Sequence, residues 1–290
     1  MGACLSTYRI AGKEITFDRT LPGFDRLFIK QANWHRTFPT YFDPSELKPA
    51  ITTEGWLLDQ STRVNLYDVK DGTWMEILEA GVFWVESTGQ LLAQIESRLS
   101  DEARQMEALL GAPLIYALAL QNVWCVHASA ALIDDQVVIF MGDSGSGKST
   151  LVRYLETRAD AIFVSDDILP VAIENGKLMA FPHFPQLKRT MLDQPGFDLP
   201  EKRPVAQIFQ LSNSQKVLIE GYPSLRGVQI LVKNSVATRL LDPLLLAKHL
   251  GFCTQAIAVT PVKSLAYPRE MSFLPTVYKA LVNDHPSELL

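Results

Sequence analysis

The sequence predicts an α/β protein in which an N-terminal antiparallel β module precedes a larger domain of alternating strands and helices. In the first 95 residues, apolar and polar side chains alternate between tight-turn sequences such as Asp71-Gly72, which is typical of short antiparallel strands. From Val123 onward, strand-like apolar runs alternate with helix-like stretches, the order expected of an α/β domain. A glycine-rich turn over residues 142–149 joins one such strand to a helical stretch. We place the boundary so that the β module, with its helices, covers 1–95 and the α/β domain covers 96–290.

The N-terminal module contains segments with strand periodicity. They cover residues 10–17, 64–69, 74–78 and 80–85. Beyond them the period changes, since apolar residues from Leu91 to Leu120 recur at helical spacing. This pattern predicts two helices between residues 90 and 122, whose apolar faces cover the sheet that follows. No set of catalytic side chains stands out in the module.

The rest of the chain predicts many strands with helices between them. Strands are expected at residues 124–133, 137–141, 161–164, 169–173, 177–180, 205–211, 216–220, 228–232, 256–261 and 265–267. Helices are expected directly after the glycine-rich turn, at residues 243–250 and at residues 273–282. Residues 182–204 are rich in proline, lysine and arginine and predict an irregular, exposed loop.

The composition argues against several classes of protein. The chain is 47% hydrophobic and 20% charged, with a net charge of -5, which is ordinary for a globular protein. It has no block rich in lysine and arginine, so nucleic acid is not an expected partner. No apolar run approaches the roughly 18 residues of a membrane span, so a membrane is not expected either. Three well-separated cysteines argue against a disulfide framework or a zinc site and predict a cytoplasmic protein.

The glycine-rich turn matches the phosphate-binding pattern G-x-x-x-x-G-K-[ST]. The apolar strand 137–141 precedes it and the helical stretch 150–155 follows, so backbone N–H groups and a helix N-terminus would form an anion site. Lys148, expected as an exposed loop lysine, would place a positive charge on the phosphates, and the Ser149 hydroxyl would bind Mg²⁺. The alternative is a glycine-rich turn that matches the pattern by coincidence. The residues expected to contact the nucleotide are Gly142, Asp143, Ser144, Gly145, Ser146, Gly147, Lys148, Ser149 and Thr150.

Two acidic residues, Asp166 and Asp167, end the apolar strand 161–164 after Ser165. A carboxylate at a strand end near a phosphate loop commonly holds Mg²⁺, and a second one can accept the proton of an attacking hydroxyl. The alternative is a solvated Asp-Asp turn. His127 follows another apolar strand, where a histidine can equally serve core packing.

These segments together resemble a known family. The order V-H-A-S-A, apolar strand, G-D-S-G-x-G-K-S, helix and a strand ending in D-D is similar to the catalytic domain of HPr kinase/phosphorylase and its shorter relatives. The resemblance is strong over residues 120–180. It implies the P-loop fold shared with phosphoenolpyruvate carboxykinase, together with ATP and Mg²⁺. It further implies that Asp166 is the general base, that Asp167 and Ser149 hold Mg²⁺, and that His127 and Lys148 lie near the γ-phosphate.

The chain also departs from that family. Thr150 stands where the family has glutamate, and the glycine-rich segment tied to phosphorolysis has no counterpart. Residues 182–189 instead resemble a segment of shorter relatives from gene clusters for ribosomally made peptides, especially lasso peptides, some of which phosphorylate the terminal serine of a precursor peptide. Lys188 and Arg189 would then contact the transferring phosphoryl group or a peptide carboxylate. The alternative is a solvated basic pair; Arg203, Arg226 and Arg269 are weaker candidates for the same role.

We therefore expect an ATP-dependent kinase that acts on a serine hydroxyl of a peptide or small protein. The resemblance implies that it tailors a ribosomally made, lasso-type precursor peptide, and a homo-oligomer is left open. One alternative is a nucleotide-dependent regulatory module without transfer activity, and another is a kinase of a small metabolite such as free serine. Phosphoenolpyruvate carboxykinase activity is disfavoured, because the lysine and histidine ligands of its Mn²⁺ and its oxaloacetate-binding arginine are not evident in the sequence.

Overall fold

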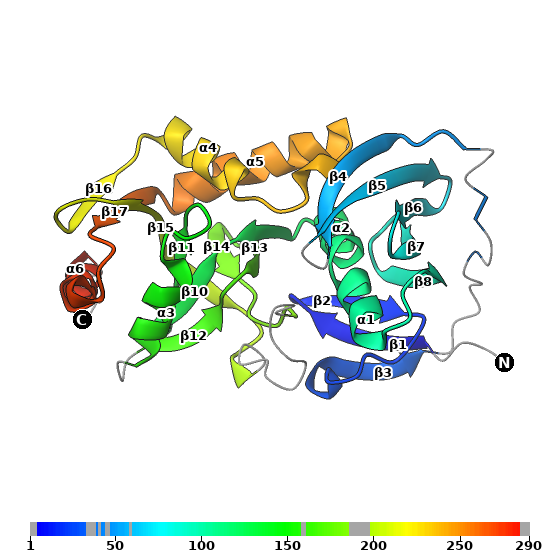
Figure 1. Ribbon diagram of the computed structural model, residues 1–290, viewed down its shortest axis with the longest axis horizontal. Coiled ribbons are helices and arrows are strands. Elements are labelled where there is room, and N and C mark those ends of the chain that lie inside the picture. Colours follow the sequence, from blue (N-terminus) through cyan, green and yellow to red (C-terminus); the bar gives the residue numbers. More distant parts are fainter. Residues whose placement is uncertain are drawn as a thin grey trace. The chain divides into compact units, whose positions relative to one another are not determined.

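The computed structural model describes residues 5–32, 39, 42–43, 47–57, 60–157, 161–185 and 198–284 of the 290-residue chain. These residues divide into two units (Figure 1). The first contains the chain up to residue 124 and residues 237–248, and the second contains most of the remainder. Both units combine β-sheet with helices, so the predicted α/β class is confirmed. Among the described residues, none of the helices has the length and apolar character needed to cross a membrane.

The first unit is built on an eight-stranded sheet with the order β3-β1-β2-β8-β7-β6-β5-β4. Neighbouring strands are antiparallel, except that β2 and β8 are parallel. The strands are β1 (Leu5–Ile10), β2 (Lys13–Phe17), β3 (Phe28–Ala32), β4 (Ile51–Leu57), β5 (Gln60–Val69), β6 (Gly72–Ile77), β7 (Gly81–Glu86) and β8 (Leu91–Ser97). The short helix η1 (Asp25–Leu27) precedes β3.

Two helices, α1 (Glu102–Leu110) and α2 (Ala112–Leu120), follow this sheet. Asp101 caps α1, since its carboxylate accepts a hydrogen bond of 2.9 Å from the N–H of Arg104. The helices pack on β7 and β8, not on the sheet that follows, so that part of the prediction is wrong. The helical prediction is also wrong over 91–97, which is strand, because a short apolar run fits both periods. The two helices therefore fall in the first unit, which does not end at residue 95.

The sheet of the second unit has nine strands. Its order is β12-β10-β11-β15-β14-β13-β9, with β17 also paired to β15 and β16 paired to β17. The strands are β9 (Trp124–His127), β10 (Ser129–Ile133), β11 (Gln136–Met141), β12 (Ala161–Ser165), β13 (Ile168–Glu174), β14 (Lys177–Ala180), β15 (Arg203–Asn213), β16 (Leu218–Gly221) and β17 (Val262–Tyr267). The predicted strand 124–133 is thus two strands, which Ala128 separates.

Strand direction brings several carboxyl ends to one edge of this sheet. Strand β10 is antiparallel to both β11 and β12, so β11 and β12 run in the same direction. Strand β15 is parallel to β11 and to β17. The carboxyl ends of β11, β12, β15 and β17 therefore lie on the same edge, which is where open α/β sheets commonly bind ligands.

Helices of the second unit cover the sheet and one another. They are α3 (Lys148–Glu156), α4 (Ser224–Lys233), α6 (Leu274–Asp284) and the short η5 (Met271–Phe273). Helix α5 (Pro243–Val259) has residues in both units, and η4 (Thr238–Leu240) precedes it. Buried side chains of α3 (Leu151, Val152 and Leu155) face β10 and β12, and α6 packs against α3. Each fully buried side chain of this kind stabilises the fold by about 1.5–3 kcal/mol, so α3 holds the preceding loop on a rigid base.

Two predicted strands are helical in the structure. Residues 228–232 lie in α4, and residues 256–259 form the end of α5. The β-branched runs favour strand locally, but tertiary packing overrides this preference. Gly227 of α4 lies so close to Ile257 of α5 that a Cβ atom would be 3.0 Å from Ile257 Cγ2. The start of the predicted exposed loop is also different, since Phe184 is only 1% exposed.

Candidate active site

Residues 142–149 connect β11 to α3 at the edge where the carboxyl ends meet. Gly142 has a φ angle of 152°, and Gly147, which precedes the first turn of α3, has a φ angle of 92°. Residues other than glycine rarely adopt these φ angles. In addition, a Cβ atom on Gly142 would lie only 2.7 Å from Ser146 Oγ. The loop is therefore tightly curled, and it leads into a helix N-terminus, which attracts anions.

Two buried side chains equip this loop for an anion. Lys148 is 7% exposed, not exposed as expected, and its ammonium group donates to the carbonyls of Gly142 (2.7 Å) and Asp143 (3.3 Å). The Ser146 hydroxyl is buried and, within the described part of the chain, has no hydrogen-bond partner. A buried polar group without a partner costs about 1–3 kcal/mol. A phosphate oxygen would satisfy this hydroxyl, so the loop fits the predicted ligand.

The predicted carboxylates lie where two short connections between strands come together. Ala128 joins β9 to β10, and Asp166 and Asp167 join β12 to β13. The N–H of Ala128 donates to the carbonyl of Asp167 at 3.1 Å. Nδ1 of His127 lies 3.1 Å from Oδ1 of Asp167. The structure thus brings His127 and the two aspartates together.

Ser129 completes this cluster, and the sequence analysis did not single it out. It is fully buried, and its hydroxyl donates to Oδ1 of Asp166 at 2.9 Å. Ser129 also pairs in register with Phe140, close to the point where the loop 142–149 begins. The cluster is therefore held next to the loop by the pairing of β10 with β11. The only sequence signal that could have identified Ser129 was its position directly after His127 and Ala128.

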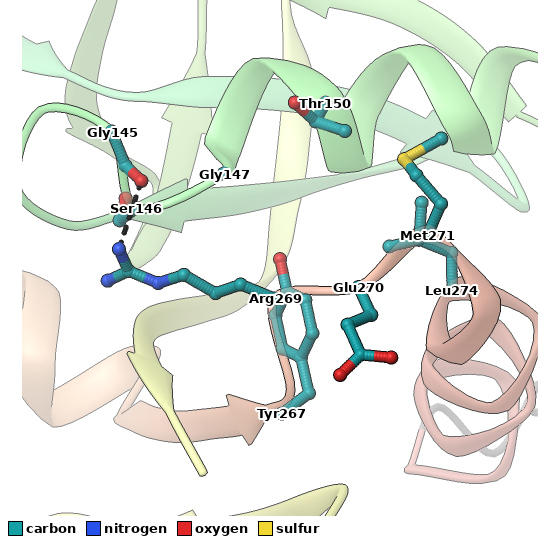
Figure 2. A pocket seen from close by; sticks show the side chains of 9 residues that line it. All are labelled: Gly145, Ser146, Gly147, Thr150, Tyr267, Arg269, Glu270, Met271 and Leu274. Atoms are coloured by element: carbon teal, nitrogen blue, oxygen red, sulfur yellow. Dashed lines mark hydrogen bonds between the residues drawn. The ribbon is translucent and has the colours of Figure 1, made fainter. Parts of the chain in front are cut away.

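Figure 2 shows a pocket beside the loop, with a volume of about 310 Å³. Pockets that hold small ligands span roughly 300–1,000 Å³. Its lining consists of Gly145, Ser146, Gly147, Thr150, Tyr267, Arg269, Glu270, Met271 and Leu274. The Tyr267 ring, Met271 and Leu274 form apolar walls, whereas Thr150 and Glu270 supply polar groups.

The segment after β17 contacts the loop directly. Arg269 donates to the carbonyl of Gly145 at 3.2 Å (Figure 2). A Cβ atom on Gly147 would lie 3.2 Å from the hydroxyl of Tyr267, the last residue of β17. Burial raises the pKa of Tyr267, and the positive charge of the nearby Arg269 offsets part of this rise. The Tyr267 hydroxyl therefore stays neutral. Sequence patterns ranked Arg269 as a weak candidate and missed Tyr267 and Glu270, because only the parallel pairing of β15 and β17 brings them here.

The predicted magnesium ligands are oxygen donors of the right kind. Among the described residues, no three histidine, cysteine or acidic side chains lie close enough to hold a metal ion by themselves. Mg²⁺ is usually held by one or two protein oxygens together with the phosphates of its substrate. Ser149 in the first turn of α3 and Asp167 match this smaller set. Lys188 and Arg189 lie outside the described residues.

Comparison with known proteins shows a distant likeness to solved structures. Neither the family models nor the curated protein sequences match this chain. Among solved structures, the chain is similar to the Hpr(Ser) kinase/phosphatase from Coxiella burnetii, with 20% sequence identity and a TM-score of 0.32. The match covers 56% of this chain and 95% of that one. A likeness at this identity and TM-score does not assign a function to this chain.

Proposed function

We propose that this chain is an ATP-dependent kinase that transfers the γ-phosphoryl group to a serine hydroxyl of a peptide or small protein. The observation that carries the proposal is the placement of a phosphate-type loop and a carboxylate cluster at the same edge of one sheet. Ser129 links the two, since it pairs with Phe140 of β11 and hydrogen-bonds Asp166. In-line phosphoryl transfer needs mainly positioning and charge stabilisation, and these residues offer both.

The roles follow from the chemistry of each side chain. Asp166 would accept the proton of the acceptor hydroxyl, and the hydrogen bond from Ser129 would fix the rotation of its carboxylate. Lys148 would release the loop carbonyls and pair with the β- and γ-phosphates. Ser149 and Asp167 would hold Mg²⁺, which neutralises charge on the phosphates. His127 orients Asp167 and lies on the γ-phosphate side of the cluster in this assignment.

The pocket beside the loop is the proposed site of the nucleoside. Its apolar walls suit a flat base, and Thr150 and Glu270 are available to its polar edge or to the ribose. The pocket lies against Gly145 and Gly147, so a nucleoside in it would leave its phosphates at the loop. This supports a nucleoside triphosphate as the phosphoryl donor.

For the acceptor, we propose a peptide whose serine lies at or near its C-terminus. The support is the resemblance of residues 182–189 to relatives from lasso-peptide gene clusters, and the lack of the segment tied to phosphorolysis. A charge-assisted pair between a basic side chain and the terminal carboxylate contributes about 1.5–3 kcal/mol. That is enough to favour a free C-terminus about tenfold or more.

A comparison of acceptors tests the proposed function. The full chain is incubated with ATP and Mg²⁺ and one of three acceptors: a serine-ended peptide, the same peptide amidated at its C-terminus, or free serine. Mass spectrometry then detects the added phosphoryl group. We expect the free-acid peptide to be phosphorylated fastest. Equal rates for both peptides would remove carboxylate recognition, efficient turnover of free serine would indicate a metabolite kinase, and nucleotide binding without transfer to any acceptor would indicate a regulatory module.

A further inference from the structure

Lys233, the last residue of α4, has its ammonium group on the phosphate loop. Its Nζ lies 2.6 Å from Oδ1 of Asp143, the second residue of the loop. The two side chains are 66% and 78% exposed. An ion pair this exposed adds little to the stability of a fold. The fold therefore loses little when another anion draws the Lys233 ammonium group away from Asp143.

The chain after Lys233 holds it near the catalytic cluster. The carbonyl of Asn234 accepts a 2.7 Å hydrogen bond from the N–H of His127, and the N–H of Val236 donates to the carbonyl of Cys125 at 2.8 Å. These bonds run the segment alongside β9. The backbone of Lys233 is thereby held close to His127, because the next residue, Asn234, bonds to His127. The ammonium group of Lys233 reaches the loop 142–149.

Two cations act on the carboxylate of Asp143. The hydrogen bond from Lys233 is the main cause that lowers the pKa of Asp143, and the positive charges of Lys233 and Lys148 lower it further. Lys148 is the lysine assigned above to the β- and γ-phosphates. The Lys233 ammonium group is thus drawn to an anionic group that also feels the charge of Lys148.

We propose that Lys233 is a second phosphate-binding lysine, which moves from Asp143 to the γ-phosphate when the nucleotide binds. This inference rests on the proposed function, because it needs a triphosphate in the loop. A γ-phosphate carries more negative charge than one carboxylate and would compete for the ammonium group. The flexible lysine side chain can reorient without any change in the backbone. A cation at this position would also stabilise charge on the transferring phosphoryl group.

Nucleotide binding tests this assignment without any acceptor. Calorimetry measures the affinity of the full chain for Mg²⁺ with ADP and with a non-hydrolysable ATP analogue, in the wild type and in Lys233→Met. Loss of a charge-assisted contact predicts that Lys233→Met binds the ATP analogue roughly tenfold or more weakly, whereas its affinity for ADP stays nearly unchanged. Lys233→Arg keeps the charge and should keep most of the preference for the triphosphate.

Lys177→Met is the matched control, because Lys177 is an exposed lysine at the start of β14 in the same unit. It should bind both nucleotides like the wild type, and the thermal unfolding temperature without nucleotide checks that each variant is folded. An equal effect of Lys233→Met on both nucleotides, or no effect on either, would overturn the role of Lys233 alone. A wild-type chain that binds neither nucleotide would overturn the proposed function and this inference with it.

Discussion

His127 and Asp167 are in contact through Nδ1 and Oδ1 at 3.1 Å, His127 at the end of β9 and Asp167 in the link between β12 and β13. The contact is possible because β13 is the neighbour of β9 in the sheet, while β12 pairs with β10, which follows β9 in the chain. The hydrogen bond from Ala128 N–H to the carbonyl of Asp167 fixes the same crossing in the backbone. The carboxylates are thus held by main-chain pairing and by side chains together, which is the rigidity that phosphoryl transfer requires.

Lys148→Ala should abolish nucleotide binding while the protein remains folded. The substitution removes the buried ammonium group that now bonds the carbonyls of Gly142 and Asp143. Carbonyls left without this donor cost about 1–3 kcal/mol, so thermal unfolding without nucleotide should shift modestly. Addition of ATP should raise the unfolding temperature of the wild type but not of the variant. Equal stabilisation of both proteins by ATP would contradict the assignment of Lys148.

Ser129→Ala should lower the rate of phosphoryl transfer without weakening nucleotide binding. Ser129 touches no substrate in this account, and it acts by orienting Asp166 through a 2.9 Å hydrogen bond. Loss of a hydrogen bond to a charged group corresponds to about 1.5–3 kcal/mol, or roughly a 10- to 100-fold lower kcat. Measured kcat and nucleotide affinity check this split. A fall in affinity with an unchanged kcat would indicate that Ser129 shapes the loop instead.

Asp167→Asn should raise the Mg²⁺ concentration needed for activity. An amide is a weaker ligand for a hard cation than a carboxylate, and the substitution also removes the charge that faces His127. Titration of activity with Mg²⁺ measures the effect, and saturating Mg²⁺ should restore much of the rate. An unaltered Mg²⁺ requirement would assign the metal to other residues.

Gly142→Ala should damage the loop more than Gly145→Ala. Both glycines have positive φ angles, of 152° and 74°, so either alanine introduces backbone strain on the order of 1–3 kcal/mol. Only at Gly142 would the new Cβ atom also collide with Ser146, at 2.7 Å, whereas nothing lies within 4 Å at Gly145. Thermal unfolding and ATP affinity compare the two variants. Equal losses would show that strain alone, without the collision, decides the effect.

Acid should destabilise the protein through His249 of α5. This side chain is 1% exposed, and burial lowers its pKa below the ordinary value of 6.5. Below pH 6.5 the imidazole of His249 binds a proton in the unfolded chain but not in the folded one. The contribution of His249 to the free energy of unfolding is therefore fully present above pH 6.5, and it is lost as the pH falls from 6.5 toward the lowered pKa. Urea unfolding at several pH values measures this slope. His249→Gln should flatten it, and an unchanged slope would assign the acid sensitivity to other groups.

The sequence predicted the parts of the site that are local in the chain. The loop 142–149, the pair Asp166-Asp167 and His127 each sit at the end of an apolar strand, and a strand end can be recognised from its own few residues. The structure describes all of these at one sheet edge. Lys148 was singled out from the sequence pattern, but its burial was not foreseen, because burial depends on how the loop curls around it.

The remaining parts depend on contacts between distant segments. Tyr267 and Arg269 reach the loop because β17 pairs with β15, and Lys233 reaches it from the end of α4. The sequence pattern favoured a strand over 228–232, since a β-branched run has strand preference when its packing partners are unknown. Helices α1 and α2 were predicted but were assigned to the other sheet. The apolar face of a helix shows that it packs on something, but the sequence does not show which sheet it packs on.

The central claim is that Asp166 accepts the proton of the acceptor hydroxyl, and single-turnover phosphoryl transfer by Asp166→Asn tests it most directly. The variant is compared with the wild type and with Asp134→Asn, which changes a carboxylate in the turn before β11, at the opposite end of that strand. The proposal predicts that Asp166→Asn binds ATP and Mg²⁺ normally but transfers the phosphoryl group about 10²–10⁴-fold more slowly, while Asp134→Asn matches the wild type. Transfer by Asp166→Asn at a rate near that of the wild type would contradict the claim.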